Sequence, residues 1–201
     1  MKYIVDNSIN DCMYIEDVLY ALCKVSIKYV LYPYDDEKKD GEDRYKYPER
    51  VFAYEFYHQY RKIMEENPNK YLGLYLNGEQ QKSSQIWKEL AKITPDIILH
   101  KNIDKPDYNG EGQKWLCEIK MLENTAVIGD LKKIKEKESV LKFDDYIFMF
   151  IGSDMDNFKR VLDDAKLSLN DVLCRTICIC AVYSDDEIKI GCKRLSEILS
   201  K

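Results

Sequence analysis

The chain lacks the features that would place it in a membrane or a secretory pathway. No apolar run approaches the roughly 20 residues that a membrane-spanning helix needs. The N-terminal segment Met1–Asp6 has no continuous apolar stretch like that of a signal peptide. We therefore expect a soluble, cytoplasmic protein with no membrane partner.

The chain also lacks an excess of basic charge. The 201 residues include 31 lysines and arginines against 36 acidic residues, a net charge of −5. A global basic surface, typical of proteins that bind nucleic acid non-specifically, is thus excluded, although a local basic cleft is not. With 45% hydrophobic residues, no internal repeat and no clear linker, 1–201 is expected to form a single domain.

Paired cysteine motifs are missing as well. Seven cysteines occur without a Cys-x-x-Cys pair, and Cys178 and Cys180 alternate with isoleucines in an apolar run. Reduced, buried thiols explain this pattern better than structural zinc. A zinc- or thiol-dependent protein that uses the C-terminal cysteines is the least favoured interpretation.

Apolar periodicity and turn residues predict an α/β fold. The segment 1–47 should hold a helix at 9–31 and a charged loop at 34–43. A core at 48–151 and a C-terminal α/β extension at 152–201 should follow. The core elements expected are a helix at 48–66, strands at 71–76, 96–100 and 114–120, a helix at 126–142 and a strand at 145–151. The extension should contain helices at 155–168 and 193–200 and strands at 175–183 and 187–190.

Two acidic residues and a lysine lie at the ends of two neighbouring strand-like runs. Asp96 begins one run, and Glu118 and Lys120 end the other. Because strand side chains alternate between faces, Glu118 and Lys120 point the same way, and a hairpin-like pairing would bring Asp96 opposite Glu118. Converging carboxylates can hold a hard divalent cation, and a nearby lysine can act on water or phosphate. The alternative is ordinary exposed charge on two half-buried strands.

The motif Pro95-Asp96 followed by Glu118-Ile119-Lys120, together with the element order, resembles the restriction-endonuclease-like superfamily with its PD-(D/E)-X-K pattern. The resemblance covers about 100 of the 201 residues. It implies an αβββαβ core with a mixed four-stranded sheet flanked by helices. It also implies that Asp96 and Glu118 bind Mg²⁺ (or Mn²⁺ as a substitute) and that Lys120 is the catalytic lysine.

The same resemblance suggests two further acidic residues for the site. Many members contribute a glutamate from the first core helix, and Glu55 matches it, although a surface ion pair explains Glu55 equally well. Some members add an acidic residue from the first core strand, which Glu79 matches, unless it is only a turn residue. Asp130 and Lys133 could face substrate, pair with Lys120 or lie on an exposed helix face.

The function expected is that of a metal-dependent endo- or exonuclease that hydrolyses phosphodiester bonds. Its partner would be nucleic acid, with DNA favoured over RNA. The alternative is a catalytically inactive module of the same fold that binds nucleic acid or protein. Tyrosines among basic residues near 44–62 fit either base stacking or core packing. Substrate specificity, pathway and oligomeric state stay open.

Overall fold

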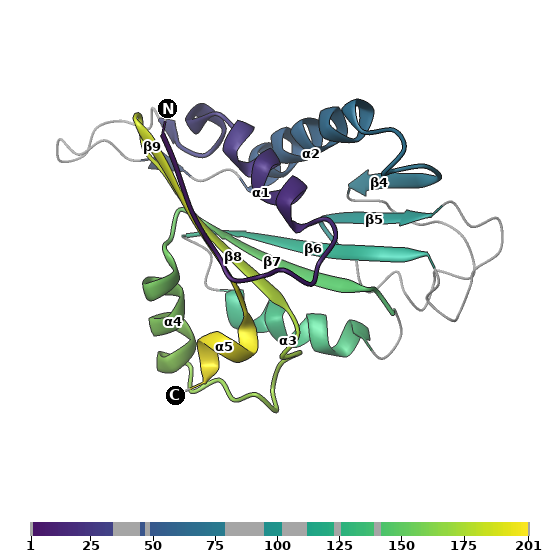
Figure 1. Ribbon diagram of the computed structural model, residues 1–201. Coiled ribbons are helices and arrows are strands. Elements are labelled where there is room, and N and C mark those ends of the chain that lie inside the picture. The colour runs from purple at the N-terminus through teal and green to yellow at the C-terminus, as the bar shows by residue number, and fades with distance from the viewer. Residues whose placement is uncertain are drawn as a thin grey trace.

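One mixed seven-stranded sheet organises the protein (Figure 1). The computed structural model describes residues 2–33, 45–46, 49–78, 95–101, 112–122, 126–138 and 142–200. The sheet therefore has more strands than the four expected from the sequence. Its spatial order is β1 (Lys2–Asn7), β9 (Glu187–Arg194), β8 (Ile177–Tyr183), β7 (Asp145–Ile151), β6 (Gln113–Met121), β5 (Ile97–Lys101) and β4 (Leu74–Gly78).

Helices cover both faces of this sheet, as Figure 1 shows. One face packs against α1 (Ile15–Lys24) and α2 (Glu49–Glu66). The other packs against α3 (Val127–Glu138), α4 (Met155–Asp164) and α5 (Leu195–Leu199). A 3₁₀ turn at Ile27–Tyr29 and a small pair of strands, β2 (Tyr32–Pro33) and β3 (Tyr45–Lys46), complete the described elements. None of the described helices combines the length and apolarity that a bilayer span requires.

The elements from α2 to β7 follow the predicted order of helix, three strands, helix and strand. Strands β4, β5 and β6 pair antiparallel, whereas β7 lies parallel to β6. A parallel neighbour needs a crossover connection, which α3 supplies. Strand β7 is covered on both faces, and six of its seven residues are buried, as its continuous apolar run predicts.

The N- and C-terminal segments contribute strands to the same sheet. Strand β1 lies parallel to β9, and β8 lies parallel to β7. The sequence does not predict β1, because all six of its residues are exposed and no burial pattern marks it. The predicted helix at 9–31 is also too long. Helix α1 ends at Lys24, where Val25 turns to an extended conformation. The predicted charged loop at 34–43 lies outside the described residues.

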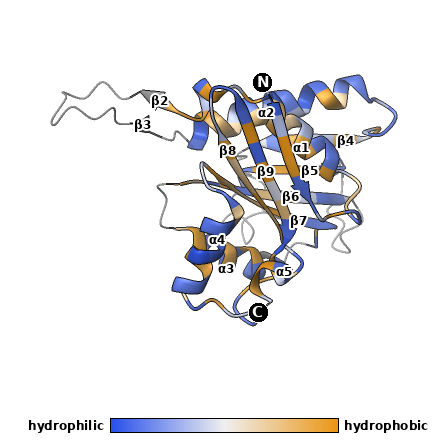
Figure 2. Cartoon of the chain, turned by 60° about the vertical axis from the view of Figure 1, so that its left-hand side comes forward, coloured by the Kyte–Doolittle hydropathy of each residue, from blue (hydrophilic) through white to orange (hydrophobic). Residues whose placement is uncertain are grey.

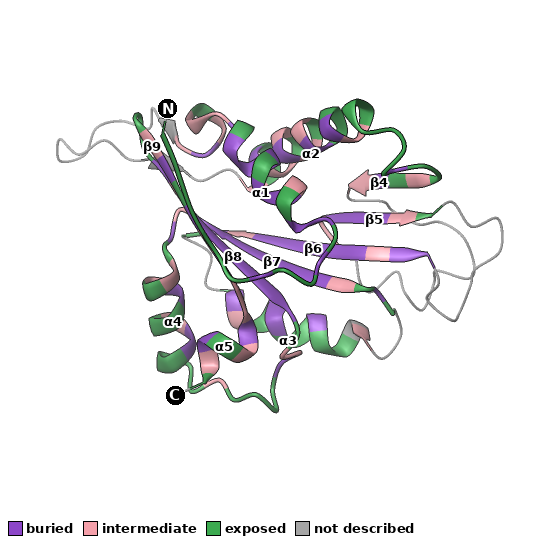
Figure 3. Cartoon of the chain, viewed as in Figure 1, coloured by how far each residue is buried: buried purple, intermediate pink, exposed green. Residues whose placement is uncertain are grey.

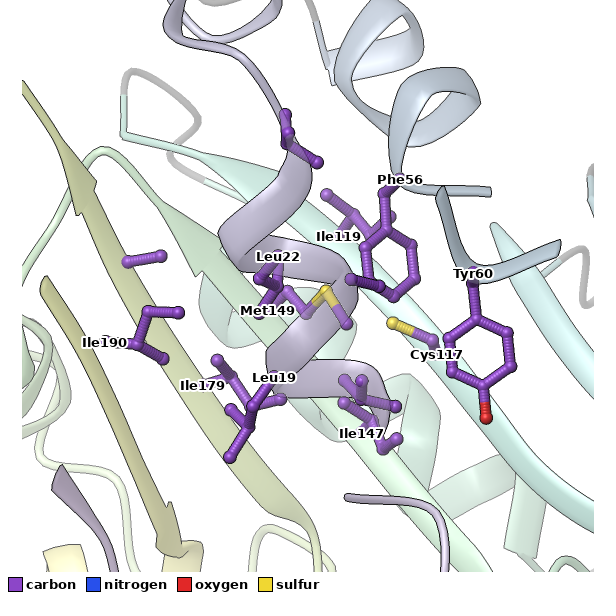
Figure 4. Close-up of a cluster of buried hydrophobic side chains, with 14 of the residues drawn as sticks. Leu19, Leu22, Phe56, Tyr60, Cys117, Ile119, Ile147, Met149, Ile179 and Ile190 are labelled. Atoms are coloured by element: carbon purple, nitrogen blue, oxygen red, sulfur yellow. The ribbon is translucent and has the colours of Figure 1, made fainter. Parts of the chain in front are cut away.

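The core under α1 and α2 is built from aromatic and aliphatic side chains (Figure 4). On α2, Phe52, Phe56, Tyr60 and Ile63 recur every three to four residues and are buried. Tyr60 packs edge-on against Trp115 of β6, with ring centroids 5.3 Å apart. Tyr60 is therefore a core residue, whereas Tyr54 is exposed. In Figure 2 the helices below the sheet carry both polar and apolar stretches, as amphipathic helices do.

All seven cysteines are free thiols, and six of them are buried. Burial raises the pKa of the Cys178 thiol well above its ordinary value, so it stays protonated at neutral pH. The interpretation of the cysteines as reduced core residues is thus confirmed for all but Cys174, which is only half-buried.

Truncation of a core residue on β6 should destabilise the fold strongly. Ile119 is fully buried between the sheet and the helices, so Ile119→Ala should lower the free energy of unfolding by about 2–5 kcal/mol. Leu72 is 83% exposed, and Leu72→Ala should change it by less than about 0.5 kcal/mol. Urea denaturation of the two variants checks this difference, and equal losses would contradict the assigned core.

Candidate active site

Asp96 and Glu118 face each other across neighbouring strands. In the antiparallel ladder of β5 and β6, Ile97 pairs with Cys117 and Ile98 with Leu116. Extending this register by one residue places Asp96 opposite Glu118. Asp96 also bonds to β6 directly, because its Oδ2 accepts a hydrogen bond from the backbone N–H of Ile119 at 2.7 Å. The strand pairing proposed from the sequence is therefore present.

Strand alternation gives Glu118 and Lys120 a common face. Cys117 and Ile119 pack in the core under α1 and α2, and Leu116 packs in the opposite core. Glu118 and Lys120 share the parity of Leu116, so they point toward the α3 side. Glu118 is only 6% exposed. Burying an unpaired charge is costly, so a carboxylate at this depth requires polar partners.

The ammonium group of Lys120 lies between carboxylates from two helices. Its Nζ donates a hydrogen bond to Glu49 Oε1 at 2.9 Å and lies 3.3 Å from Asp130 Oδ2. Glu49 begins α2 and Asp130 lies in the first turn of α3. Asp130 also accepts a hydrogen bond from Lys133 Nζ at 2.6 Å. Of the roles considered for Asp130, pairing with Lys120 is confirmed.

Lys120 is held in its charged form. Burial by itself lowers the pKa of Lys120, but the hydrogen bond and charge of Glu49 outweigh it, followed by the charges of Asp130 and Asp96. The net result is a pKa above the ordinary value of 10.5. Lys120 is therefore an ammonium group at neutral pH. It can donate hydrogen bonds but cannot accept a proton.

Lys120 belongs to a cluster of six charged side chains. The negative charge of Asp96 helps to raise the pKa of Lys120, and that of Glu118 helps to raise the pKa of Lys133. When all members are ionised, this set contains four carboxylates and two ammonium groups from the described part of the chain. Its members are Glu49, Asp96, Glu118, Lys120, Asp130 and Lys133.

Glu55, the residue expected from α2, lies elsewhere on that helix. Its Oε1 accepts a hydrogen bond from Gln59 Nε2 at 2.6 Å, one turn along the helix. At about 100° per residue, Glu55 is rotated by about 120° from Glu49 and lies about 9 Å further along the axis. The α2 carboxylate that bonds to Lys120 is therefore Glu49. No local sequence signal marks this contact, because Glu49 and Lys120 are 71 residues apart in the chain.

Glu79, the other acidic residue expected in the site, lies in the segment 79–94, outside the described residues. His100 lies on β5, where its Nε2 is 2.6 Å from Asn77 Nδ2 and its Nδ1 is 2.7 Å from the Lys101 carbonyl oxygen. An Nδ1–H tautomer, accepting from the asparagine amide, satisfies both contacts. His100 thus bridges β4 and β5.

No protein-family model, curated protein sequence or solved structure matches this chain. Within the described residues, no group of three or more His, Cys, Asp and Glu side chains is arranged to hold a metal ion. The opposed pair Asp96 and Glu118 and the ion pairs of Lys120 are the features of the described residues that bear on function.

Lys120→Gln should reveal how far the charged lysine stabilises the fold. The side chains of Lys120 and Asp130 are only 12% and 6% exposed, so removing the ammonium group should cost about 3 kcal/mol at pH 7. A raised folded-state pKa means that this stabilisation is complete below about pH 10.4, the unfolded value, and is lost as the pH rises through the folded value. The difference in unfolding free energy between wild type and variant should therefore shrink above pH 10.5.

Denaturation at several pH values measures this difference. Lys62→Gln is the matched control, because Lys62 is exposed on α2. It should leave the unfolding free energy nearly unchanged. A Lys120→Gln difference that stays constant through pH 11 would contradict the assignment.

Proposed function

We propose that this chain is a metal-dependent nuclease of the restriction-endonuclease-like class that hydrolyses phosphodiester bonds in DNA or RNA. One observation carries the proposal: Asp96 and Glu118 are opposed on adjacent strands, with the ammonium of Lys120 on the same face. The surrounding order α2, β4, β5, β6, α3 and β7, with β7 parallel to β6, agrees with the αβββαβ core expected for that class.

The donor set fits Mg²⁺, with Mn²⁺ as a substitute. Mg²⁺ prefers one or two carboxylates and keeps several waters and substrate phosphate oxygens as its other ligands. Asp96 and Glu118 would supply the carboxylates, and Glu79 is a further candidate. Asp96 gives one lone pair to the Ile119 amide, but a carboxylate offers about four such positions. When bound, the ion would lower the pKa of a coordinated water and neutralise charge on the phosphate.

Lys120 would act as a hydrogen-bond donor and a positive charge. Its raised pKa makes it unsuited to remove a proton from the attacking water at neutral pH. It suits stabilisation of the negative charge that develops on the phosphate oxygens. An ammonium group has three N–H donors. Glu49 takes one and Asp130 lies beside a second, so a third can reach the substrate.

Glu49 and Asp130 would be positioning residues. They approach Lys120 from different helices and fix the direction of its side chain. Both lie at helix N-termini, where the helix dipole stabilises ionised carboxylates. Their role would be to hold Lys120 charged and pointed at the phosphate. A role for Glu55 in the site stays a prediction, and the proposed mechanism does not use it.

Loss of the carboxylate charges should abolish cleavage. Asp96→Asn retains an oxygen that can accept the Ile119 N–H but removes the negative charge, and Glu118→Gln does the same on β6. Each variant, and Lys120→Ala, should reduce the rate of DNA or RNA hydrolysis with Mg²⁺ or Mn²⁺ by at least about a hundredfold. Single-turnover assays on labelled single- and double-stranded DNA and RNA measure these rates.

Glu65→Gln is the matched control, because it removes an exposed carboxylate near the end of α2. It should cleave at the wild-type rate. Cleavage that survives unchanged in both Asp96→Asn and Lys120→Ala would end the nuclease proposal.

The second candidate function is binding without cleavage, by a module of the same fold. The observation in its favour is that Lys120 already lies within 3.3 Å of two protein carboxylates. Such an arrangement is also a self-contained structural ion cluster, which would need no substrate. In this case nucleic acid or protein would bind while Asp96 and Glu118 served only the fold.

Metal titration separates the two candidates. If the nuclease proposal holds, millimolar Mn²⁺ should raise the melting temperature of the wild type, because a ligand that binds only the folded state stabilises it. Asp96→Asn should lose most of that shift, whereas Glu65→Gln should retain it. Differential scanning calorimetry measures the shifts. Equal responses in the wild type and Asp96→Asn would favour the binding module.

A further inference from the structure

Strand β1 is an edge strand of the sheet in the part of the chain that the structure describes. It ends the order of seven strands and pairs only with β9 in the described sheet. All six of its residues are exposed, and the strand that starts at N is green along its length in Figure 3. Three consecutive exposed side chains are apolar: Tyr3 at 47%, Ile4 at 41% and Val5 at 43%. An exposed apolar edge strand is a template for pairing with another strand.

Backbone N–H and C=O groups point alternately to the two sides of β1, which shows which of them face away from β9. The N–H of Lys2 donates to the Asp186 carbonyl, and the N–H of Ser8 donates to the Cys192 carbonyl. Even-numbered residues therefore point their backbone groups toward β9. Because strand residues alternate, Tyr3 and Val5 point their N–H and C=O groups outward.

The side chains of β1 are self-complementary in one antiparallel register. With Ile4 opposite Ile4 of a second copy, Tyr3 lies opposite Val5, and Lys2 lies opposite Asp6. Tyr3 and Val5 are the residues whose backbone groups point outward, so they form the hydrogen-bonded pairs, and Ile4 occupies the non-hydrogen-bonded position. Aromatic pairs with β-branched residues and oppositely charged pairs both stabilise adjacent strands. Each pair occurs twice, as an isologous contact requires.

We propose that β1 pairs antiparallel with β1 of a second copy of this chain, about a two-fold axis at Ile4, and joins the two sheets into one. The charges that the register needs are accessible. Lys2 contacts Glu187 at 3.6 Å and Asp6 contacts Lys193 at 3.3 Å, yet the side chains of Lys2 and Asp6 are each 72% exposed.

Helix α1 adds apolar surface on one side of this edge. Tyr3 and Val5 pair with Ile188 and Ile190 of β9, which lie in the core under α1. Tyr20 of α1 is 50% exposed. The two-fold axis brings this face of one copy beside the same face of the other. A strand pair with this flank gives an interface at the small end of the usual range, so the dimer forms reversibly and depends on concentration.

Charge reversal tests the register. In a homodimer, Lys2→Glu places two carboxylates opposite each other at both charged pairs, and Asp6→Lys places two ammonium groups opposite each other there. Each single variant should dimerise about tenfold more weakly than the wild type. In an equimolar mixture of the two variants, a mixed dimer again pairs a carboxylate with an ammonium group at both positions, so the mixture should associate as well as the wild type. Sedimentation velocity from about 1 to 500 µM spans the affinities expected of a small interface.

Lys159→Glu on α4 is the control, because it reverses a lysine charge in the same way at an exposed position away from β1; it should associate like the wild type. Hydrogen exchange adds a site-specific readout: the Tyr3 and Val5 amides should become protected as concentration rises, while the Ile4 amide stays unchanged. A wild type that stays monomeric over the whole concentration range would overturn the proposal. Strand β1 would then be available to a strand of another protein. A dimer that neither reversal weakens would overturn the proposal as well.

Discussion

The candidate site depends on one constraint: β6 is covered on both faces, yet it carries a carboxylate and an ammonium group. Trp115, Cys117 and Ile119 fill one core, and Leu116 points to the other. Period-two alternation then commits Glu118 and Lys120 to the α3 face. Water cannot solvate these groups fully at their depth, so the protein must supply counter-charges there. Glu49 and Asp130 are the counter-charges that reach Lys120.

The helix ends make these counter-charges available. Glu49 is the first residue of α2, and Asp130 lies in the first turn of α3, so both carboxylates lie in the positive field of a helix N-terminus. Burial lowers the pKa of Lys120, but the carboxylates around it outweigh burial and raise that pKa above its ordinary value. A single strand and two helices on opposite faces of the sheet are thereby connected through one side chain. Such a connection explains why the lysine is held among its partners.

Much of the fold could be predicted because its central elements carry local signals. The limits of β7 follow from an apolar run at 146–151 that is bounded by Asp145 and Gly152. The opposition of Asp96 and Glu118 could be predicted from strand parity and a turn-rich linker. Strand β1 could not, because its six exposed residues show no burial pattern. Glu49 could not either, because its partner Lys120 is 71 residues away and only the packing of α2 brings the two together.

The open edge and the candidate site lie far enough apart to act independently. From β6 to β1 the sheet has four strand-to-strand steps, or about 19 Å at about 4.8 Å per step. Across a two-fold axis at β1, the two sites would be about 43 Å apart before sheet twist shortens the distance. Along B-DNA this corresponds to about 12 or 13 base pairs at about 3.4 Å each. Two copies joined at β1 would therefore not combine their carboxylates at one phosphodiester. Under the proposed nuclease function, each site would bind its own metal and phosphate, and association would set the distance between two positions held on one nucleic acid.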